Sequence, residues 1–374
     1  MKILMISGDP QILVRNTEVR ARMKEYAALF GELHIIVIGS RAGGDERSGN
    51  LFIYGIHGRT AAVRIWRAWR RCRALQKKER FNVVSAQGAD ETGLAGFFAA
   101  RASRTPFQLQ IHTDVISPWY RRASYKERLR YWIARILIPH ADCVRVVSER
   151  IRRSLITSHQ SPVTKTTILP IFTDISKYAD ASVDPETERR FKYYHFKMLA
   201  VGRFVDKEKN FGMLIDFMRD FVKIYPNALL VLAGEGQDLG KYELGVRNYG
   251  IEKNVVIEPW RDDLPSFYKS FDLFLSSSNY EGWGRTVIEA MASGIAVVMT
   301  DVGLAGEVVR DGENGIVVPV GDKNAFLAAV VRLRRDPEKT KMLAAAGEKT
   351  IRDLSPKTKE EYLALYKKSF LSCL

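Results

Sequence analysis

The sequence predicts an α/β protein with two doubly wound domains, each built on a parallel β-sheet. Short apolar runs alternate with helical segments along the chain, which is the pattern of repeated β-α-β units. The alternation occurs twice, before and after a polar segment at residues 171–194 that has charge clusters and no clear period. With 374 residues, the chain is also long enough for two domains that each bury a core of their own.

The first half of the chain contains the strands and helices of one such domain. A helix is expected at 17–30, because its apolar side chains recur at helical spacing, and a second helix is expected after Ser148, which is a suitable N-cap. The expected strands are KILMI (2–6), LHIIVIG (33–39), NVVSA (82–86), FQLQIHTD (107–114) and the start of ADCVRVVSERIRRSL (141–155).

The second half repeats the pattern. A strand at 198–202 leads through a turn into a helix from about Asn210, and a further helix at 286–292 ends at Ser293-Gly294. The other expected strands are ALLVLAGEG (228–236), NVVIEPW (254–260), DLFLSSS (272–278) and IAVVMT (295–300). We therefore assign residues 1–175 to an N-terminal domain, 176–194 to a linker, 195–356 to a C-terminal domain and 357–374 to a final helix.

The net charge of +15 lies entirely in residues 1–180, which hold 30 Lys+Arg against 15 Asp+Glu. Two basic amphipathic stretches that contain tryptophan, Arg59–Arg80 and Arg121–Leu137, account for most of this excess. Such helices suit an anionic membrane surface, but their apolar stripes could equally face the core and leave the arginines solvated. No nucleic-acid partner is expected, because no recognised nucleic-acid motif accompanies the charge.

Three further observations bear on where the protein works. No apolar run approaches the roughly 20 residues of a spanning helix, and the apolar run at the N-terminus is too brief for a signal peptide. We expect a cytoplasmic protein, with peripheral contact to the inner face of the membrane as the extension that the basic stretches suggest. The three cysteines lack metal-ligand spacing and are expected to be reduced thiols.

The stretch NYEGWGRTVIEAMASGIAVVMTD (279–301) has the strongest functional pattern. Two carboxylates, Glu281 and Glu289, stand on either side of a turn that contains Gly282 and Gly284. Glycines let backbone N–H groups approach a ligand closely, and the N-terminus of the following helix favours phosphate oxygens. Carboxylates accept hydrogen bonds from hydroxyl groups, so a nucleotide sugar fits this arrangement.

Two cations occupy the turn between the strand at 198–202 and the next helix. Arg203 and Lys209 can neutralise a diphosphate there, while amides at the start of the helix add donors. His112 ends an apolar run in the first half, at the carboxyl end of an expected strand, where ligands bind in doubly wound sheets.

The segment EGWGRTVIEAMASG resembles the Glu-x7-Glu signature of the retaining, nucleotide-sugar-dependent glycosyltransferases of family four (group 1). The resemblance covers most of the chain. It implies the GT-B fold, in which two Rossmann-like domains face a central cleft and the C-terminal helix crosses back to the N-terminal domain. The implied reaction moves a sugar from a UDP- or GDP-sugar to an acceptor hydroxyl, as in cell-surface polysaccharide or glycolipid synthesis.

The resemblance also implies roles for individual residues. Arg203 and Lys209 would bind the donor diphosphate, with Lys207 as the alternative lysine, and Glu289 would hold the ribose. Catalysis would depend on His112, Glu281, Arg203 and Lys209. The expected donor-binding residues are Arg203, Lys209, Trp260, Glu281, Gly282, Trp283, Gly284, Arg285, Thr286 and Glu289.

No metal and no cofactor is expected, because the two cations can replace a divalent ion at the diphosphate. The expected acceptor is a glycan or a lipid-linked glycan. The loop after the first strand, GDPQILVRN, lacks the Gly-Gly pair that is usual in the family. The open alternatives are another GT-B enzyme, such as a nucleotide-sugar epimerase or a phosphorylase, and a non-catalytic protein that binds membrane or nucleic acid.

Overall fold

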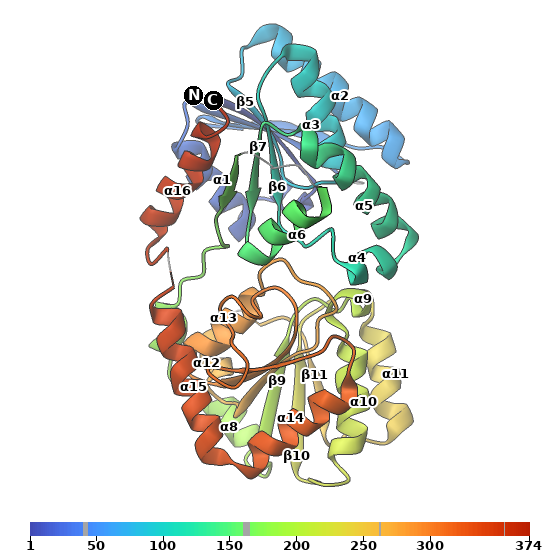
Figure 1. The fold of residues 1–374 in the computed structure, drawn as a ribbon, viewed down its shortest axis with the longest axis vertical. Helices are drawn as coiled ribbons and strands as arrows, with labels where there is room; N and C mark the ends of the chain where they lie inside the picture. The colour runs from blue at the N-terminus through green and yellow to red at the C-terminus, as the bar shows by residue number, and fades with distance from the viewer. Residues whose placement is uncertain (40–43, 160–164, 262, 355) are drawn as a thin grey trace. The chain divides into compact units, whose positions relative to one another are not determined.

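The computed structural model describes residues 1–39, 44–159, 165–261, 263–354 and 356–374. The chain forms two compact units (Figure 1). Unit 1 comprises Met1–Pro170 together with Lys359–Leu374, and unit 2 comprises Ile171–Thr358. Each unit contains one sheet with helices packed against it, so the predicted α/β class with two doubly wound domains is confirmed.

The sheet of unit 1 has eight strands in the order β3-β4-β2-β1-β5-β6-β7-β8. All pairs are parallel except β3 with β4, which forms an antiparallel edge that the sequence analysis did not predict. The strands are β1 (Lys2–Ser7), β2 (Glu32–Ile38), β3 (Asp45–Ser48), β4 (Leu51–Ile56), β5 (Val83–Ala86), β6 (Phe107–Ile111), β7 (Cys143–Val146) and β8 (Thr166–Ile168).

Several helices of unit 1, among them α1, α2, α3 and α5, begin at side chains that cap them. Thr17, for example, accepts a hydrogen bond from the Arg20 amide at the start of the first α-helix. The helices are η1 (Pro10–Leu13), α1 (Glu18–Ala28), α2 (Ala61–Lys78), α3 (Glu91–Ser103), α4 (Pro118–Ala123), α5 (Tyr125–Leu137), η2 (Ile138–His140), α6 (Glu149–His159) and α16 (Lys359–Leu371).

The C-terminal helix α16 returns to unit 1 and packs on α1 and the sheet, as Figure 1 shows. The ring of Tyr366 stacks on Tyr26 at 4.1 Å between centroids, and the Tyr362 and Tyr26 hydroxyl groups are 3.0 Å apart. In the sheet, Gln108 Nε2 donates a hydrogen bond to the Ser369 carbonyl at 2.9 Å. The predicted return of this helix to the N-terminal domain is therefore confirmed.

The expectation of three reduced thiols is wrong. Cys143 on β7 and Cys373, just after α16, form a disulfide across 230 positions of sequence. Cys72 is a free thiol on α2, and burial raises its pKa to about 12. The local spacing of cysteines could not reveal the disulfide, because only the return of α16 brings its two partners together.

The sheet of unit 2 has six parallel strands in the order β11-β10-β9-β12-β13-β14. The strand order reverses between β9 and β12, which makes their carboxyl ends the topological switch point of this sheet. The strands are β9 (Phe196–Val201), β10 (Ala228–Ala233), β11 (Val255–Glu258), β12 (Leu273–Ser276), β13 (Ala296–Thr300) and β14 (Ile316–Val318).

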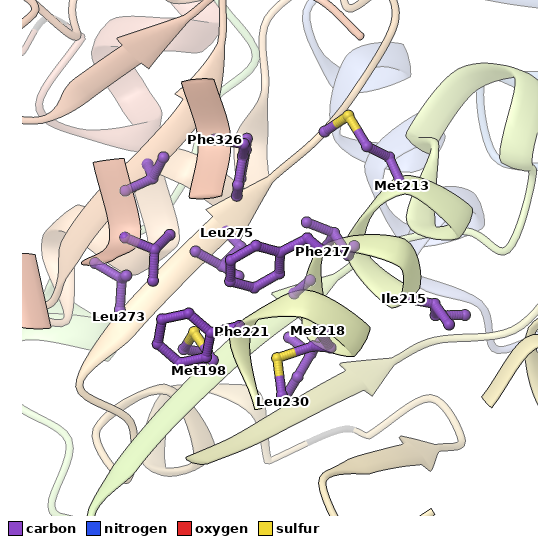
Figure 2. Packing of buried hydrophobic residues seen from close by; sticks show 14 of the residues in the cluster. Met198, Met213, Ile215, Phe217, Met218, Phe221, Leu230, Leu273, Leu275 and Phe326 are labelled. Atoms are coloured by element: carbon purple, nitrogen blue, oxygen red, sulfur yellow. The ribbon is translucent and has the colours of Figure 1, made fainter. Parts of the chain in front are cut away.

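Helices cover this sheet and bury a core rich in phenylalanine and methionine (Figure 2). Phe217 packs against Phe221 and Phe326, with ring centroids 5.2 and 5.9 Å apart. The helices are α7 (Ser176–Ala179), α8 (Pro185–Arg190), α9 (Asp206–Lys209), α10 (Phe211–Phe221), α11 (Leu239–Tyr249), α12 (Leu264–Tyr268), α13 (Arg285–Ala292), α14 (Lys323–Arg335) and α15 (Pro337–Arg352).

The segment assigned to a linker, 176–194, is part of unit 2 in the structure, which begins at Ile171. Its two short helices, α7 and α8, hold to that unit. The ring of Tyr178 packs edge-on against Tyr268 at 5.8 Å, and Lys269 Nζ donates a hydrogen bond to the Ala179 carbonyl at 3.0 Å. Helices of one turn bury too few side chains to produce a hydrophobic period, which explains why the sequence resembled a linker.

Candidate functional site

The predicted donor-site residues of the second half gather at the switch point of unit 2. Gly202 and Arg203 follow β9, and the loop 277–284 follows β12, its neighbour in the sheet. Parallel strands bring their carboxyl ends to one edge, so two segments separated by about 70 positions meet there. The structure thus brings Arg203, Lys209, Glu281, Gly282, Gly284 and Glu289 into one unit at one edge.

Lys209 and Glu281 form the centre of this site. The Lys209 ammonium group donates a hydrogen bond to the Glu281 carboxylate, and both side chains are mostly buried. Ser278 Oγ also donates to Glu281 Oε1, at 2.8 Å. A charged pair that is mostly removed from water needs such additional donors to hold its geometry. Lys209, rather than the alternative Lys207, is the lysine that meets the first signature glutamate.

Backbone contacts fix the loop against helix α9. Ser277 Oγ donates to the Lys209 carbonyl at 2.8 Å, and the Asn279 amide donates to the Glu208 carbonyl at 2.8 Å. Asn210 ends α9 in the left-handed region, with φ of 53°, a conformation that asparagine tolerates better than most residues. These contacts hold the two backbone segments that carry Lys209 and Glu281 next to each other.

Arg203 is exposed, and a glutamate that the sequence analysis missed neutralises it. One Arg203 guanidinium nitrogen, Nη2, donates to both Glu208 carboxylate oxygens, at 2.7 and 2.9 Å. Glu208 Oε1 also lies 3.8 Å from Lys209 Nζ. An incoming anion would therefore compete with two carboxylates for these two cations. The position of Glu208 between the cations in sequence was a signal that could have identified it.

The glycine turn leads directly into α13. Gly284 is the N-cap with φ of 103°, a conformation that favours glycine. Gly303, which the sequence analysis missed, also has a positive φ of 54°, and a Cβ there would lie 2.6 Å from the Trp283 carbonyl oxygen. Thr286 lies in the first turn of α13, whose N–H groups point out of the helix end and favour anions. The backbone of this turn thus leaves room for a close ligand beside the first N–H groups of α13.

Trp283 contributes to this turn through its backbone and its packing. Its indole ring is buried, and the indole N–H has no hydrogen-bond partner among the described residues. Trp283 was predicted as a donor-binding residue, and its burial leaves only the main chain available for that role.

Glu289 lies inside unit 2 and is only 1% exposed. Arg285 Nε donates to its Oε1 at 2.7 Å, and Tyr268 Oη donates to its Oε2 at 3.1 Å. Burial raises the pKa of the Tyr268 hydroxyl, with a further contribution from the Glu289 charge, so Tyr268 remains a hydrogen-bond donor. Nothing in the local sequence marked Tyr268, which comes from α12 and reaches Glu289 through the fold.

Trp260 lies just beyond β11 and is exposed. The Gly234 amide donates to the Glu258 carbonyl at 3.0 Å, and Arg190 Nη1 lies 2.5 Å from Glu258 Oε1. Gly236 has φ of 155°, and a Cβ there would lie 2.5 Å from the Phe204 carbonyl oxygen. The segments after β9, β10 and β11 are therefore closely packed, with Trp260 at one end of this row of strands.

His112 belongs to unit 1 and follows β6 directly. Burial, with smaller contributions from the charges of Arg145 and Arg22, lowers the pKa of its imidazole to about 3. The ring is therefore neutral at physiological pH. Asp114, two residues further along the chain, is half-buried, and its Oδ1 accepts hydrogen bonds from Ser154 Oγ at 3.0 Å and from the Ile116 amide at 3.2 Å. Burial raises the pKa of this carboxyl group.

One group of metal-binding side chains occurs in the described part of the chain. Glu32, His34 and Glu79 in unit 1 have potential ligand atoms within 4.8 Å of one another. Lys2 Nζ already lies 3.0 Å from Glu32 and 2.9 Å from Glu79. His34 Nδ1 is 3.0 Å from the Tyr54 hydroxyl. The Lys2 ammonium group pairs with both carboxylates, so these side chains form an ion-pair cluster.

No helix in the described segments combines the length with the apolar character that crossing a lipid bilayer requires.

Two family models match the chain, one in each half. The model for glycosyl transferases group 1 matches residues 188–350, and the model for a glycosyl transferase 4-like domain matches residues 16–171. The first match contains all the site residues of unit 2, and the second contains His112.

Curated relatives give the same result at the level of sequence. The lipopolysaccharide core biosynthesis glycosyltransferase LpsE of Rhizobium meliloti (strain 1021) is 31% identical over 154 residues, which are 41% of this chain and 44% of that protein. A UDP-Gal:alpha-D-GlcNAc-diphosphoundecaprenol alpha-1,3-galactosyltransferase of Escherichia coli is 21% identical over 276 residues, 70% of this chain and 68% of that protein. The chain spans about half the length of the first curated relatives it matches.

Solved structures share the fold of the whole chain. A sucrose-phosphate synthase from Thermosynechococcus elongatus superposes with a TM-score of 0.80 at 21% identity, covering 99% of each chain. Anabaena Alr3699/HepE in complex with UDP superposes with a TM-score of 0.74 at 17% identity, covering 100% of each chain. At these identities the likeness establishes the fold.

Proposed function

The chain belongs to the group 1 glycosyltransferases, a family with the GT-B fold, and we propose that it transfers a sugar from a nucleoside-diphosphate sugar to an acceptor hydroxyl with retention of configuration. The observation that supports this proposal best is the pairing of Lys209 with Glu281 beside the first turn of α13. A cation, a carboxylate that can accept hydrogen bonds from sugar hydroxyl groups, and a helix N-terminus that favours phosphate then meet at one switch point.

The two cations and α13 serve the leaving group. When the bond to the sugar breaks, negative charge develops on the nucleoside diphosphate. Arg203, Lys209 and the N–H groups of Arg285 and Thr286 would stabilise that charge. The backbone that carries Lys209 is held in place by Ser277 and Asn279 before the ligand arrives, while the diphosphate would have to displace the carboxylates that pair with both cations. In this scheme the side chains supply the positive charge, and neither a metal ion nor a cofactor is required.

The two signature glutamates would hold hydroxyl groups. Glu281 is placed to accept from the donor sugar beside the diphosphate, since its carboxylate is held next to Lys209. Glu289 would accept from the ribose. Because Glu289 is buried and one of its oxygens accepts from Arg285, ribose binding requires the exposed Arg285 side chain to move aside. Tyr268 would keep the carboxylate in place during that exchange.

His112 would contribute to the reaction face from unit 1. A pKa of about 3 keeps the imidazole neutral, so it would offer one donor and one acceptor rather than a charge. A neutral ring suits a contact with a sugar or acceptor hydroxyl group.

We propose UDP as the nucleotide of the donor, with GDP as the alternative. The support is that the structural neighbour HepE was solved with UDP, and that the Escherichia coli relative is named for UDP-Gal. That relative is also named for a diphosphoundecaprenol-linked acceptor, which supports a lipid-linked glycan as the acceptor here. An enzyme with such an acceptor would work at the inner face of a membrane, as a peripheral protein.

The experiment is an assay of nucleoside-diphosphate release from UDP- and GDP-sugars, with a bacterial lipid extract as the source of acceptors. We expect release with one nucleotide class and dependence on the extract, and proton NMR of the product should show the anomeric configuration of the donor. Lys209→Met should abolish release, whereas Lys223→Met, a matched change at an exposed lysine of unit 2, should not. Release that proceeds equally in Lys209→Met would contradict the proposal.

A further inference from the structure

Helix α5 has two apolar faces, one of which points away from the protein. The inner face packs on unit 1 through Glu127, Tyr131, Ala134 and Leu137. The outer face carries four large apolar side chains, and all four are exposed. Tyr125 is 83% exposed, Leu129 61%, Trp132 55% and Ile136 60%.

The spacing of these residues makes the outer face continuous. They occur at positions i, i+4, i+7 and i+11 of the helix. At 100° per residue they fall within about 60° of one another, on the side opposite the buried residues. A helix that has already buried one face has no folding requirement for a second apolar stripe. Exposed stripes of this kind mark interaction surfaces.

Cations flank the stripe on both sides. On the helical projection, Arg128 and Arg135 lie to one side of it and Lys126 to the other, and the Arg128 guanidinium sits over the Tyr125 ring at 4.9 Å. The adjoining helix α4 ends in Arg121 and Arg122. The segment 118–137 contains a single acidic residue, which is the buried Glu127.

We propose that the outer face of α5 docks the protein on an anionic lipid bilayer. Tyr125, Leu129, Trp132 and Ile136 enter the headgroup boundary, and the flanking cations bind lipid phosphates. This deepens the proposed function, on which it rests, because it specifies the surface through which an enzyme acting on a lipid-linked acceptor would reach that acceptor. It also explains why this helix, unlike an ordinary amphipathic helix, is apolar on its outer side.

Charge complementarity favours lipid over a second copy of the chain. A symmetric dimer through this stripe would bring together the cations of α4 and α5 from both copies. Neither of these helices has an exposed acidic residue that could pair with those cations. An anionic bilayer instead supplies the opposite charge around the apolar stripe. The bilayer interface also suits tryptophan and tyrosine, whose rings are apolar with one polar end.

The other basic stretch has a different structure. Helix α2 buries Ala68, Cys72 and Leu75, and most of its exposed side chains are Arg or Lys. Its exposed large apolar side chains are Val63 (38%) and Trp66 (50%), and the Arg70 guanidinium lies over the Trp66 ring at 4.7 Å. It is an ordinary amphipathic helix with a solvated basic face. Of the two stretches that the sequence analysis left open between core and membrane, only Arg121–Leu137 carries an outward apolar stripe, and the proposal concerns that stretch alone.

The test is co-sedimentation of the full chain with vesicles of phosphatidylcholine, with and without phosphatidylglycerol. We expect binding to the anionic vesicles only. The double variant Leu129→Ser/Trp132→Ser should weaken that binding by at least about tenfold, because it removes half of the inserted apolar side chains. Leu244→Ser, at an exposed leucine on α11, is the matched control and should bind like the wild type.

A second pair of variants tests the cations. Arg122→Glu/Arg128→Glu should lose binding to anionic vesicles, while Arg247→Glu/Arg332→Glu, with the same change in net charge at exposed sites of unit 2, should retain most of it. Equal losses in the two charge variants would show attraction through net charge alone and overturn the proposal. Binding by Leu129→Ser/Trp132→Ser at the wild-type level would overturn it as well.

Two controls separate this proposal from its rivals. A wild-type dimer that Leu129→Ser/Trp132→Ser converts to a monomer, without vesicle binding by either, would identify the stripe as a protein interface and reject the lipid. Thermal shifts with UDP and with GDP test the donor site independently of lipid. If Leu129→Ser/Trp132→Ser keeps the nucleotide shift and loses vesicle binding, the docking surface is supported. Vesicle binding by a wild type that shows no shift with either nucleotide would reject the proposed function and leave the docking surface standing.

Discussion

The ammonium group of Lys209 donates a hydrogen bond to the carboxylate of Glu281, joining the turn after β9 to the loop after β12. These strands are neighbours at the point where the sheet reverses its order, and backbone contacts from Ser277 and Asn279 fix the two segments together. The pair therefore has a structural role within unit 2 as well as its proposed role with the donor.

A double-mutant cycle should detect the coupling between these two residues. Lys209→Met and Glu281→Gln each remove one charge from a mostly buried pair, and each should lower the free energy of unfolding by about 1–3 kcal/mol. The double variant should lose less than the sum, by a coupling energy of about 1–3 kcal/mol. Urea denaturation measures all four proteins. Strict additivity would show that the two side chains do not interact.

Arg285 should oppose nucleotide binding through its contact with Glu289. In Arg285→Leu the buried Glu289 keeps its hydrogen bond from Tyr268 but loses its charged partner. The free energy of unfolding of the ligand-free protein should therefore fall by about 1–3 kcal/mol. The ribose would then meet no competitor, so UDP should bind more tightly than it does to the wild type. Calorimetric titration measures the affinity. Weaker binding by Arg285→Leu would indicate instead that the guanidinium group itself contacts the ligand.

His112 should make unit 1 sensitive to acid. Its pKa is about 3 in the folded state and 6.5 in its unperturbed state, so the unfolded chain binds the proton first as the pH falls. Stability should therefore fall between about pH 6.5 and pH 3, by about 2 kcal/mol on reaching pH 5. In His112→Gln this contribution should be absent from urea denaturation curves at the two pH values. An unchanged difference between pH 7 and pH 5 would show that the imidazole is not desolvated.

Helix α16 should be required for the stability of unit 1. Tyr366 is fully buried, stacks on Tyr26 at 4.1 Å and lies 5.2 Å from the Arg145 guanidinium. Tyr366→Ala should lower the free energy of unfolding by about 3–5 kcal/mol. Tyr193→Ala, at an exposed tyrosine of unit 2, should change it by less than about 0.5 kcal/mol. A small effect of Tyr366→Ala would mean that the helix is only loosely attached.

The pattern of strands and helices was sufficient to predict the fold class, because buried parallel strands are short, apolar and separated by helices. It did not predict the antiparallel β3–β4 edge, whose outer strand, DERS, is polar and lacks an apolar run. The helices α7 and α8 were assigned to a linker for a similar reason, since each has too few residues to show a period. The disulfide depends on tertiary contacts that no local pattern encodes.

In the candidate site, the residues near the backbone turns could be predicted, and their partners could not. Gly284 carries a local signature, because a tight turn before a helix demands glycine, and Glu281 is marked by its spacing from Glu289. Tyr268 carries none, because it reaches Glu289 only through the fold, and Glu208 was marked only by its position in sequence between the two predicted cations. The outward stripe on α5 was visible as an apolar period, but only burial distinguishes a core face from an exposed one.

The most direct test of the central claim is calorimetric titration of the wild type, Lys209→Met and Lys223→Met with UDP and GDP. The account predicts that one of these nucleotides binds the wild type at a single site. Lys209→Met should bind at least about tenfold more weakly, a loss of about 1.4 kcal/mol, and Lys223→Met should bind like the wild type. Failure of both nucleotides to bind, or equal binding by Lys209→Met, would contradict the assignment of the donor site to the switch point of unit 2.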